Sequence, residues 1–111
     1  MIDYDQLVAA TKKVPRDGRN YKDGNGFCYY TDSSGRNCLV GAILLKLDIT
    51  LPPFDDPLNR ASITALPAAA FFVRPLPDLL CNIQWLADRG TLTWGEVIDI
   101  VLSDYDAGAY L

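Results

Sequence analysis

Histidine is absent from the sequence. Without an imidazole the chain cannot build a Ser–His or Cys–His nucleophile pair, a metal site that uses histidine, or a side-chain base whose ordinary pKa lies near neutral pH. These groups carry most common hydrolytic reactions. The absence therefore predicts a protein without catalytic residues, and it favours a role in binding over one in catalysis.

Long apolar runs are also absent. No stretch reaches the roughly eighteen consecutive apolar residues that a membrane-spanning helix needs. The opening residues, MIDYDQLV, lack the basic and then apolar pattern of a secretory signal. We therefore expect a cytoplasmic protein with no membrane contact.

Cysteine is scarce, and its spacing shows no pairing pattern. Cys28, Cys38 and Cys81 are an odd number, and no two of them form a Cys-x-x-Cys pair. A tetrahedral zinc site would need a fourth ligand from an aspartate. The chain also has no Gly-rich motif of the kind that cradles a nucleotide phosphate. We expect largely buried thiols, no disulfide framework, no metal and no cofactor.

The residues that are present are typical of one globular domain. The chain has 111 residues, of which 50% are hydrophobic and 22% are charged. A chain of this size buries roughly 65% of the surface that it exposes when unfolded. We predict a single domain over residues 1–111, mainly α with a minor β component (α+β), in which four to five helices surround a central apolar helix.

The N-terminal residues predict a helix followed by a loop. Asp3 and Gln6 have the spacing of a capping box, and apolar residues then recur at helical intervals until Pro15, so we predict a helix over 4–14. Residues 15–26 are rich in glycine and charge and have no apolar period. They predict a mobile basic loop.

The central helix is expected to follow a short β element. The aromatic run FCYYT and the turn sequence DSSGRN favour a strand or hairpin near 27–37. Asn37 is the expected cap of a helix over 38–47, which is apolar around its whole circumference except at Lys46. Gly41 would allow a neighbouring element to approach this helix closely.

Prolines interrupt the middle of the chain. Asp56 before Pro57 is a good helix start, because proline at the first helical position loses no hydrogen bond that would otherwise form. Pro67 interrupts the apolar stretch that follows, which predicts one or two short helices between 58 and 72. Residues 106–111 form a short tail.

Two further helices are predicted near the C-terminus. Asp78 is the expected cap of a helix over 78–89, which has a stripe of leucine, isoleucine and alanine on one face. Thr93 and Glu96 form a second capping box, and apolar residues then repeat at three and four positions, which predicts a helix from 94 to 105.

The loop after the first helix is the one basic part of an acidic chain. The net charge is −4, but residues 11–36 carry +3. This segment could touch phosphates or an acidic protein surface through Arg16, Arg19, Tyr21 and Lys22. A net charge of +3 is small for a nucleic-acid interface, so we expect no nucleic acid as partner. A weak nucleic-acid binder that uses residues 12–26 is kept as an alternative.

Cys38 is the one thiol in a position of chemical interest. A helix N-terminus and the nearby Arg36 would both favour a thiolate, as in hydrolases that place a nucleophilic cysteine at such a site. Those enzymes need the imidazole that this chain lacks, and the helix after Cys38 is expected to be core. A thiol-dependent enzyme is therefore the second alternative.

Aromatic residues indicate a protein-binding surface. On the helical wheel of residues 78–89, Trp85 lies opposite the leucine stripe. Tyr29 and Tyr30 are neighbours on an expected strand, so one of them should point away from the core. Because Tyr and Trp often anchor interfaces, we predict a non-enzymatic interaction protein whose partner is another protein.

Two segments of the chain, NCLVGAILLKLDI and NIQWLADRGTLTWGEVI, resemble small proteins encoded by actinobacterial phages and their hosts. Those proteins show a Cys, an apolar residue, Val and Gly at a helix start, and later a Gln, an Asp-x-Gly and a Trp-Gly. The matching residues here are Cys38, Val40, Gly41, Gln84, Asp88, Gly90, Trp94 and Gly95.

The chain departs from that pattern at Asp48, where a glycine is usual, and at Glu96 and Val97, where an alanine is common. The resemblance implies a phage-type accessory protein in a bacterial cytoplasm that acts on a host component. Because its residues are also those assigned to helix starts and packing, it favours a shared scaffold over a shared active site.

Overall fold

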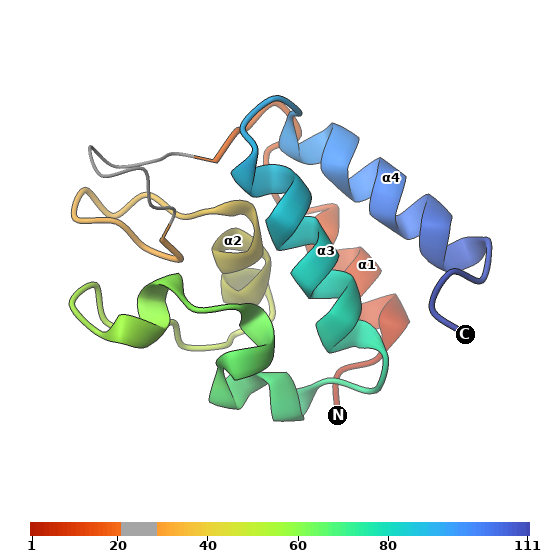
Figure 1. Cartoon of the computed structure of the whole chain (residues 1–111), viewed down its shortest axis with the longest axis horizontal. Helices are drawn as coiled ribbons and strands as arrows, with labels where there is room; N and C mark the ends of the chain where they lie inside the picture. The colour runs from red at the N-terminus through yellow and green to blue at the C-terminus, as the bar shows by residue number, and fades with distance from the viewer. Residues whose placement is uncertain (21–28) are drawn as a thin grey trace.

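The protein is mainly helical, as the sequence predicts. A computed structural model describes residues 1–20 and 29–111 (Figure 1). Within these residues lie four α-helices and three short 3₁₀-helices: α1 (Tyr4–Thr11), α2 (Leu39–Lys46), η1 (Pro57–Arg60), η2 (Ile63–Ala65), η3 (Pro67–Phe71), α3 (Leu76–Asp88) and α4 (Trp94–Asp106). The described residues form no sheet, and an isolated β-bridge pairs Ile2 with Phe72 in parallel.

Helices α2 and α3 form the centre of the molecule. α3 contacts α2, α4 and η2, and α1 packs on α2. Figure 1 shows α3 crossing the middle of the view, between α2 on one side and α1 and α4 on the other. The predicted central apolar helix is confirmed, because Leu39, Val40, Ile43 and Leu44 of α2 are all fully buried.

Both predicted capping boxes are present. The Asp3 carboxylate accepts a hydrogen bond from the Gln6 amide, and the Gln6 side chain accepts one from the Asp3 amide, each at 2.9 Å. Thr93 and Glu96 make the same exchange at 3.3 and 2.9 Å, at the start of α4. These bonds satisfy amides that the first helical turn leaves without partners. α1 ends at Thr11, however, which is earlier than the predicted residue 14.

The predicted cap of α2 is wrong by one residue. Cys38 is the cap, and its Sγ accepts a hydrogen bond from the Gly41 amide at 3.3 Å. Asn37 turns away, and its side-chain amide donates to the Tyr30 carbonyl at 2.8 Å. The close approach expected at Gly41 is confirmed, since a Cβ built there would lie 2.5 Å from the Tyr30 carbonyl oxygen.

The predicted cap of α3 is also wrong. The helix begins at Leu76, so Asp78 lies inside its first turn. Pro77 is tolerated beside it because an amide in the first turn has no helical acceptor to lose. In this position the Asp78 carboxylate still interacts favourably with the positive end of the helix dipole.

The strand or hairpin expected near 27–37 is not seen in the described residues. Residues 27 and 28 lie outside the described part of the chain, and 29–37 form a turn without a strand, in which the Asp32 side chain accepts hydrogen bonds from the amides of Ser34 and Arg36. Short helices are present between 58 and 72, as expected, and they are 3₁₀-helices. Two of them begin at a proline, and such short runs suit the tighter 3₁₀ turn.

Candidate functional site

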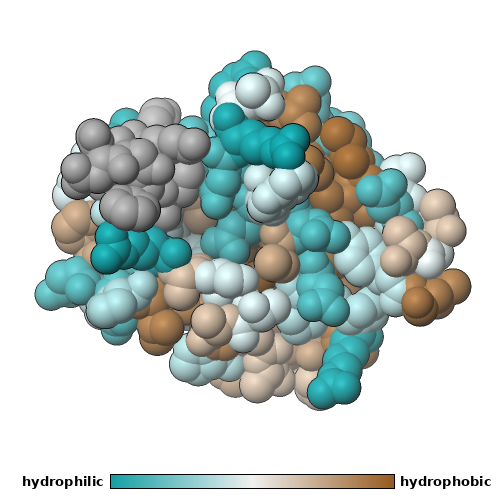
Figure 2. All heavy atoms as spheres, in the orientation of Figure 1, coloured by the Kyte–Doolittle hydropathy of each residue, from teal (hydrophilic) through white to brown (hydrophobic). Residues whose placement is uncertain are grey.

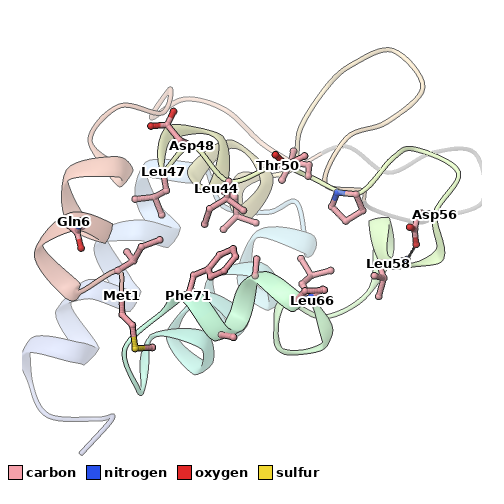
Figure 3. Close-up of a pocket in the computed structure, with 17 residues that line it drawn as sticks. Met1, Gln6, Leu44, Leu47, Asp48, Thr50, Asp56, Leu58, Leu66 and Phe71 are labelled. Carbon is pink, nitrogen blue, oxygen red and sulfur yellow. Dashed lines mark hydrogen bonds between the residues drawn. The ribbon is translucent and has the colours of Figure 1, made fainter.

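An apolar groove lies between the chain that leaves α2 and the 3₁₀-helix η3. Its volume is about 870 Å³, and 17 residues line it (Figure 3). Four of these are polar, namely Gln6, Asp48, Thr50 and Asp56. The other lining residues are Met1, Ile2, Leu44, Leu47, Ile49, Leu51, Pro52, Leu58, Leu66, Pro67, Ala68, Ala70 and Phe71.

The groove has a buried floor and an exposed rim. Leu44 and Leu66 are buried, whereas Phe71 is 55% exposed and Met1 is 81% exposed. Figure 3 shows Leu44 and Leu47 on one side and Phe71 and Leu66 on the other, with Met1 at one end and Asp56 at the opposite end. Large apolar side chains on a solvent-facing rim are typical of a binding surface.

One wall of the groove is formed by the reversal of the chain after α2. Asp48 has φ +60°, the Asp48 amide donates to the Leu45 carbonyl at 3.1 Å, and the Ile49 amide donates to the Leu44 carbonyl at 3.0 Å. This is a Schellman ending, in which the residue with positive φ is most often glycine. It directs residues 49–52 back over the end of α2.

The opposite wall is formed by η3 and the strand-like pairing that follows it. The Ile2 amide donates to the Phe71 carbonyl at 2.7 Å, and the Val73 amide donates to the Ile2 carbonyl at 2.9 Å. Phe72 between them is buried, so Phe71 points the other way, toward the groove. The N-terminal residues and η3 therefore hold each other in place.

The two carboxylates of the lining differ in what they contact. Asp56 accepts a hydrogen bond from the Leu58 amide at 2.9 Å and so caps η1. Asp48 is exposed, and neither a hydrogen bond nor an ion pair engages its carboxylate in the described residues. Figure 3 places this carboxylate at the outer edge of the groove, above Leu47.

Trp85, the first residue predicted for a protein interface, lies on the surface of α3. It is 59% exposed, and the Arg89 guanidinium carbon lies 3.7 Å from its ring centroid. The predicted position opposite the apolar stripe is thus confirmed. Figure 2 shows the face that carries α3, where hydrophilic side chains cover most of the centre and hydrophobic ones gather beside α4. Arg89 covers one face of the indole, so a partner would meet an aromatic–cation pair.

The two adjacent tyrosines have different environments. Tyr30 is 1% exposed; its hydroxyl donates to the Ala61 carbonyl at 2.6 Å and accepts from the Gln84 amide at 3.0 Å. Burial raises the pKa of Tyr30 far above its ordinary value. Tyr30 is therefore a core residue that no partner can reach. Tyr29 is half-buried, and its ring lies 5.5 Å from that of Phe54.

The described part of the basic loop packs on the corner between α3 and α4. The backbone carbonyls of Arg16 and Gly18 accept hydrogen bonds from the first two amides of α4, at 2.9 and 2.7 Å. The Arg16 side chain pairs with Asp99 at 2.6 Å, and Arg19 donates to the carbonyls of Gly90 and Thr91. Residues 15–20 are thus tied to the helices rather than loose.

Two further predicted residues of this loop, Tyr21 and Lys22, lie outside the described residues. The two described arginines that were expected to reach a partner, Arg16 and Arg19, are already engaged within the chain. A partner that used them would have to compete with these contacts.

Cys38 does not lie in an open cleft. It is 4% exposed, and the void beside it, which Tyr29, Asp32, Arg36 and Asn37 also line, has a volume of about 10 Å³. Burial would raise the pKa of Asp32, but hydrogen bonds from Arg36 and Ser34 outweigh it and lower that pKa. The Asp32 carboxylate is therefore already hydrogen-bonded within the chain. Among the described residues, no group of three or more Cys, Asp or Glu side chains is placed to hold a metal ion.

Sequence reasoning missed a polar centre at Asn20. The Asn20 Oδ1 accepts hydrogen bonds from the Leu39 amide at 2.7 Å and from the Trp94 indole at 3.0 Å, and its Nδ2 donates to the Asp88 carboxylate at 2.8 Å. One side chain from the loop thus joins the start of α2, the end of α3 and the start of α4. No local pattern marks Asn20, because its three partners come from distant parts of the chain.

The residues that carry the resemblance to phage proteins lie at such packing points. Gln84 joins the Tyr30 hydroxyl to the Ile63 amide, while Asp88 and Trp94 meet at Asn20. Their contacts hold elements together, and none of the three lines the groove.

No family model, curated protein or solved structure matches the chain. In the described residues, no helix combines the length and the apolar character that crossing a membrane would require.

Proposed function

We propose that this protein is a non-enzymatic interaction module that binds an apolar segment of another protein in the groove between residues 47–52 and η3. The observation that carries this proposal is the apolar lining of the groove, together with the exposure of Phe71 and Met1 on its rim. Grooves of this kind receive amphipathic segments whose apolar side chains anchor the complex.

A protein segment fits this groove better than a small molecule. Its volume lies within the range of small-molecule pockets, but such pockets bury most of the ligand surface. Here Phe71 and Met1 stay largely exposed, so the occupant itself must cover them. A segment that belongs to a folded partner brings enough additional surface to do so.

The chemistry of the chain supports binding over catalysis. The sequence has no histidine, and Cys38 is buried and caps α2 through its sulfur. The resemblance to phage-encoded proteins suggests a setting for this binding, namely an accessory protein in a bacterial cytoplasm that acts on a host component. The pair of Trp85 and Arg89 offers a second surface on which a partner could bind instead.

The test is a capture experiment from actinobacterial lysate with matched variants. Phe71→Asp places a charge on the rim of the groove, and Val73→Asp places the same charge on an exposed residue that does not line it. A partner that binds in the groove should be lost with Phe71→Asp and retained with Val73→Asp. With the purified partner, the loss should reach about 30-fold in Kd, since an interface anchor contributes roughly 2 kcal/mol.

Trp85→Ala, tested in parallel, separates the two surfaces. If the partner is lost with Trp85→Ala and kept with Phe71→Asp, the interface lies on α3 and the proposed groove is wrong. If the wild-type protein retains no partner, the interaction function itself is contradicted.

A further inference from the structure

We propose that the segment bound in the groove carries a lysine or arginine next to its apolar residues, and that this cation pairs with Asp48. The proposal rests on the proposed function, because it names the chemistry of the partner that the groove accepts. It follows from the charge, the surroundings and the backbone conformation of Asp48.

The charged side chains that line the groove have one sign. Its lining contains two carboxylates, those of Asp48 and Asp56, and no lysine or arginine among the described residues. Lys46 lies two positions before Asp48 on α2 but does not line the groove. An apolar surface with acidic edges attracts a partner that is apolar in the middle and basic at its flank.

Asp48 is the carboxylate that can accept this cation. Asp56 already caps η1, whereas the Asp48 carboxylate has no polar partner among the described residues. In Figure 3 it stands at the edge of the groove above Leu47, so it faces the flank of a bound segment rather than its apolar centre. A basic residue just beyond the apolar stretch would therefore meet it.

Glycine would be more stable than aspartate at this backbone position. Asp48 has φ +60°, a region that residues with a side chain enter at a cost and that glycine enters freely. The chain nevertheless carries a carboxylate here, on the edge of its apolar groove. A role in recognition would account for a residue that the helix ending alone does not favour.

The same charge argues against other occupants. A fatty acid or an anionic lipid headgroup would bring negative charge next to Asp48 and Asp56, which is repulsive. A second copy of the chain carries a net charge of −4 and would also be repelled in general. A basic, apolar segment of a different protein is the occupant that this electrostatic pattern favours.

The experiment selects peptides of about twelve random residues on the full-length protein, and removes those that also bind Phe71→Asp. We expect the remaining peptides to combine apolar residues with at least one lysine or arginine. For one labelled peptide, Kd is then measured by fluorescence anisotropy against the wild-type protein and Asp48→Asn. We expect binding to weaken about tenfold, the equivalent of about 1.4 kcal/mol.

Three controls make this result specific to Asp48. Asparagine tolerates positive φ, so Asp48→Asn should keep the fold, and its thermal unfolding is measured alongside. Asp55→Asn removes the same charge from an exposed residue outside the groove and should leave Kd unchanged. Replacing the peptide's cation by norleucine should weaken binding to the wild-type protein but not to Asp48→Asn, which is the signature of direct coupling.

The outcomes separate this proposal from the function on which it rests. If the selected peptides depend on Phe71 but show no basic preference and no coupling to Asp48, the pairing is wrong and the groove remains a binding site. If no peptide distinguishes the wild-type protein from Phe71→Asp, the groove does not bind protein segments, and both proposals fail. Sedimentation that showed a dimer dissociated by Phe71→Asp would assign the groove to a second copy and also overturn the proposal.

Discussion

Replacing Asn20 by alanine should destabilise the protein far more than the loss of an ordinary loop side chain. The Asn20 amide group makes three hydrogen bonds, which reach the Leu39 backbone, the Trp94 indole and the Asp88 carboxylate at 2.7, 3.0 and 2.8 Å. Each joins a different helix end to the loop. Asn20→Ala therefore loosens three junctions at once.

The magnitude follows from these contacts. A neutral hydrogen bond contributes about 0.5–1.5 kcal/mol to stability, and one to a charged group contributes about 1.5–3 kcal/mol. Asn20 is only partly buried, so water can replace some of what is lost. We expect Asn20→Ala to lower the free energy of unfolding by about 2–4 kcal/mol.

The assay is urea unfolding followed by circular dichroism, with Asn82→Ala as the matched control. Asn82 is exposed and donates one hydrogen bond to the Tyr110 hydroxyl at 2.6 Å, so its removal should cost about 0.5–1 kcal/mol. Asn20→Asp keeps the acceptor but sets a second carboxylate against Asp88, and should also destabilise. If Asn20→Ala cost no more than Asn82→Ala, Asn20 would not be the junction that we describe.

Three further predictions concern single positions. Gly41→Ala should lower the unfolding free energy by about 1–3 kcal/mol in the same assay, because the new Cβ would lie 2.5 Å from the Tyr30 carbonyl oxygen; a gain in stability would contradict this close contact. Asp48→Gly should raise the melting temperature through a gain on the order of 1 kcal/mol, because glycine adopts φ +60° without strain. Hydrogen bonds from Thr93 lower the pKa of Glu96 below its ordinary 4.5. The ionised Glu96 carboxylate therefore stabilises the fold fully above pH 4.5, and this stabilisation is lost as the pH falls through the pKa that Glu96 has in the folded protein. The melting temperature of Glu96→Gln should accordingly lie below that of the wild-type protein at about pH 7 and approach it under acid, and a constant difference would refute the assignment.

The sequence predicted those elements whose signals are local. The capping boxes at Asp3 and Thr93 begin α1 and α4, because a side chain and an amide three residues apart suffice to form them. The composition of residues 38–47 predicts the central position of α2, since a helix that is apolar on all sides must be buried. Its cap was misplaced because cysteine is a weak acceptor and Asn37 is the more usual cap, yet Asn37 is held by the Tyr30 carbonyl.

The candidate site was not predictable in the same way. Trp85 could be placed opposite the apolar stripe of its helix because a helical wheel needs only the sequence. The groove, in contrast, joins Gln6, the chain after α2 and η3, which are distant in the sequence and individually look like core or loop. The pairing of Ile2 with Phe72, which turns Phe71 outward, has no sequence signal at all.

The region between residues 48 and 72 shows why the groove forms at this place. Prolines prevent long α-helices there, so the chain crosses the core in short 3₁₀ turns that cannot bury an apolar stripe as long as that of α3. The apolar side chains that these turns leave uncovered, with Phe71 at 55% exposure, have to face solvent or a partner. Polar side chains at Phe71 and Met1 would have removed this exposure. Large apolar side chains at these two rim positions are the physical reason for regarding this surface as one that a partner covers.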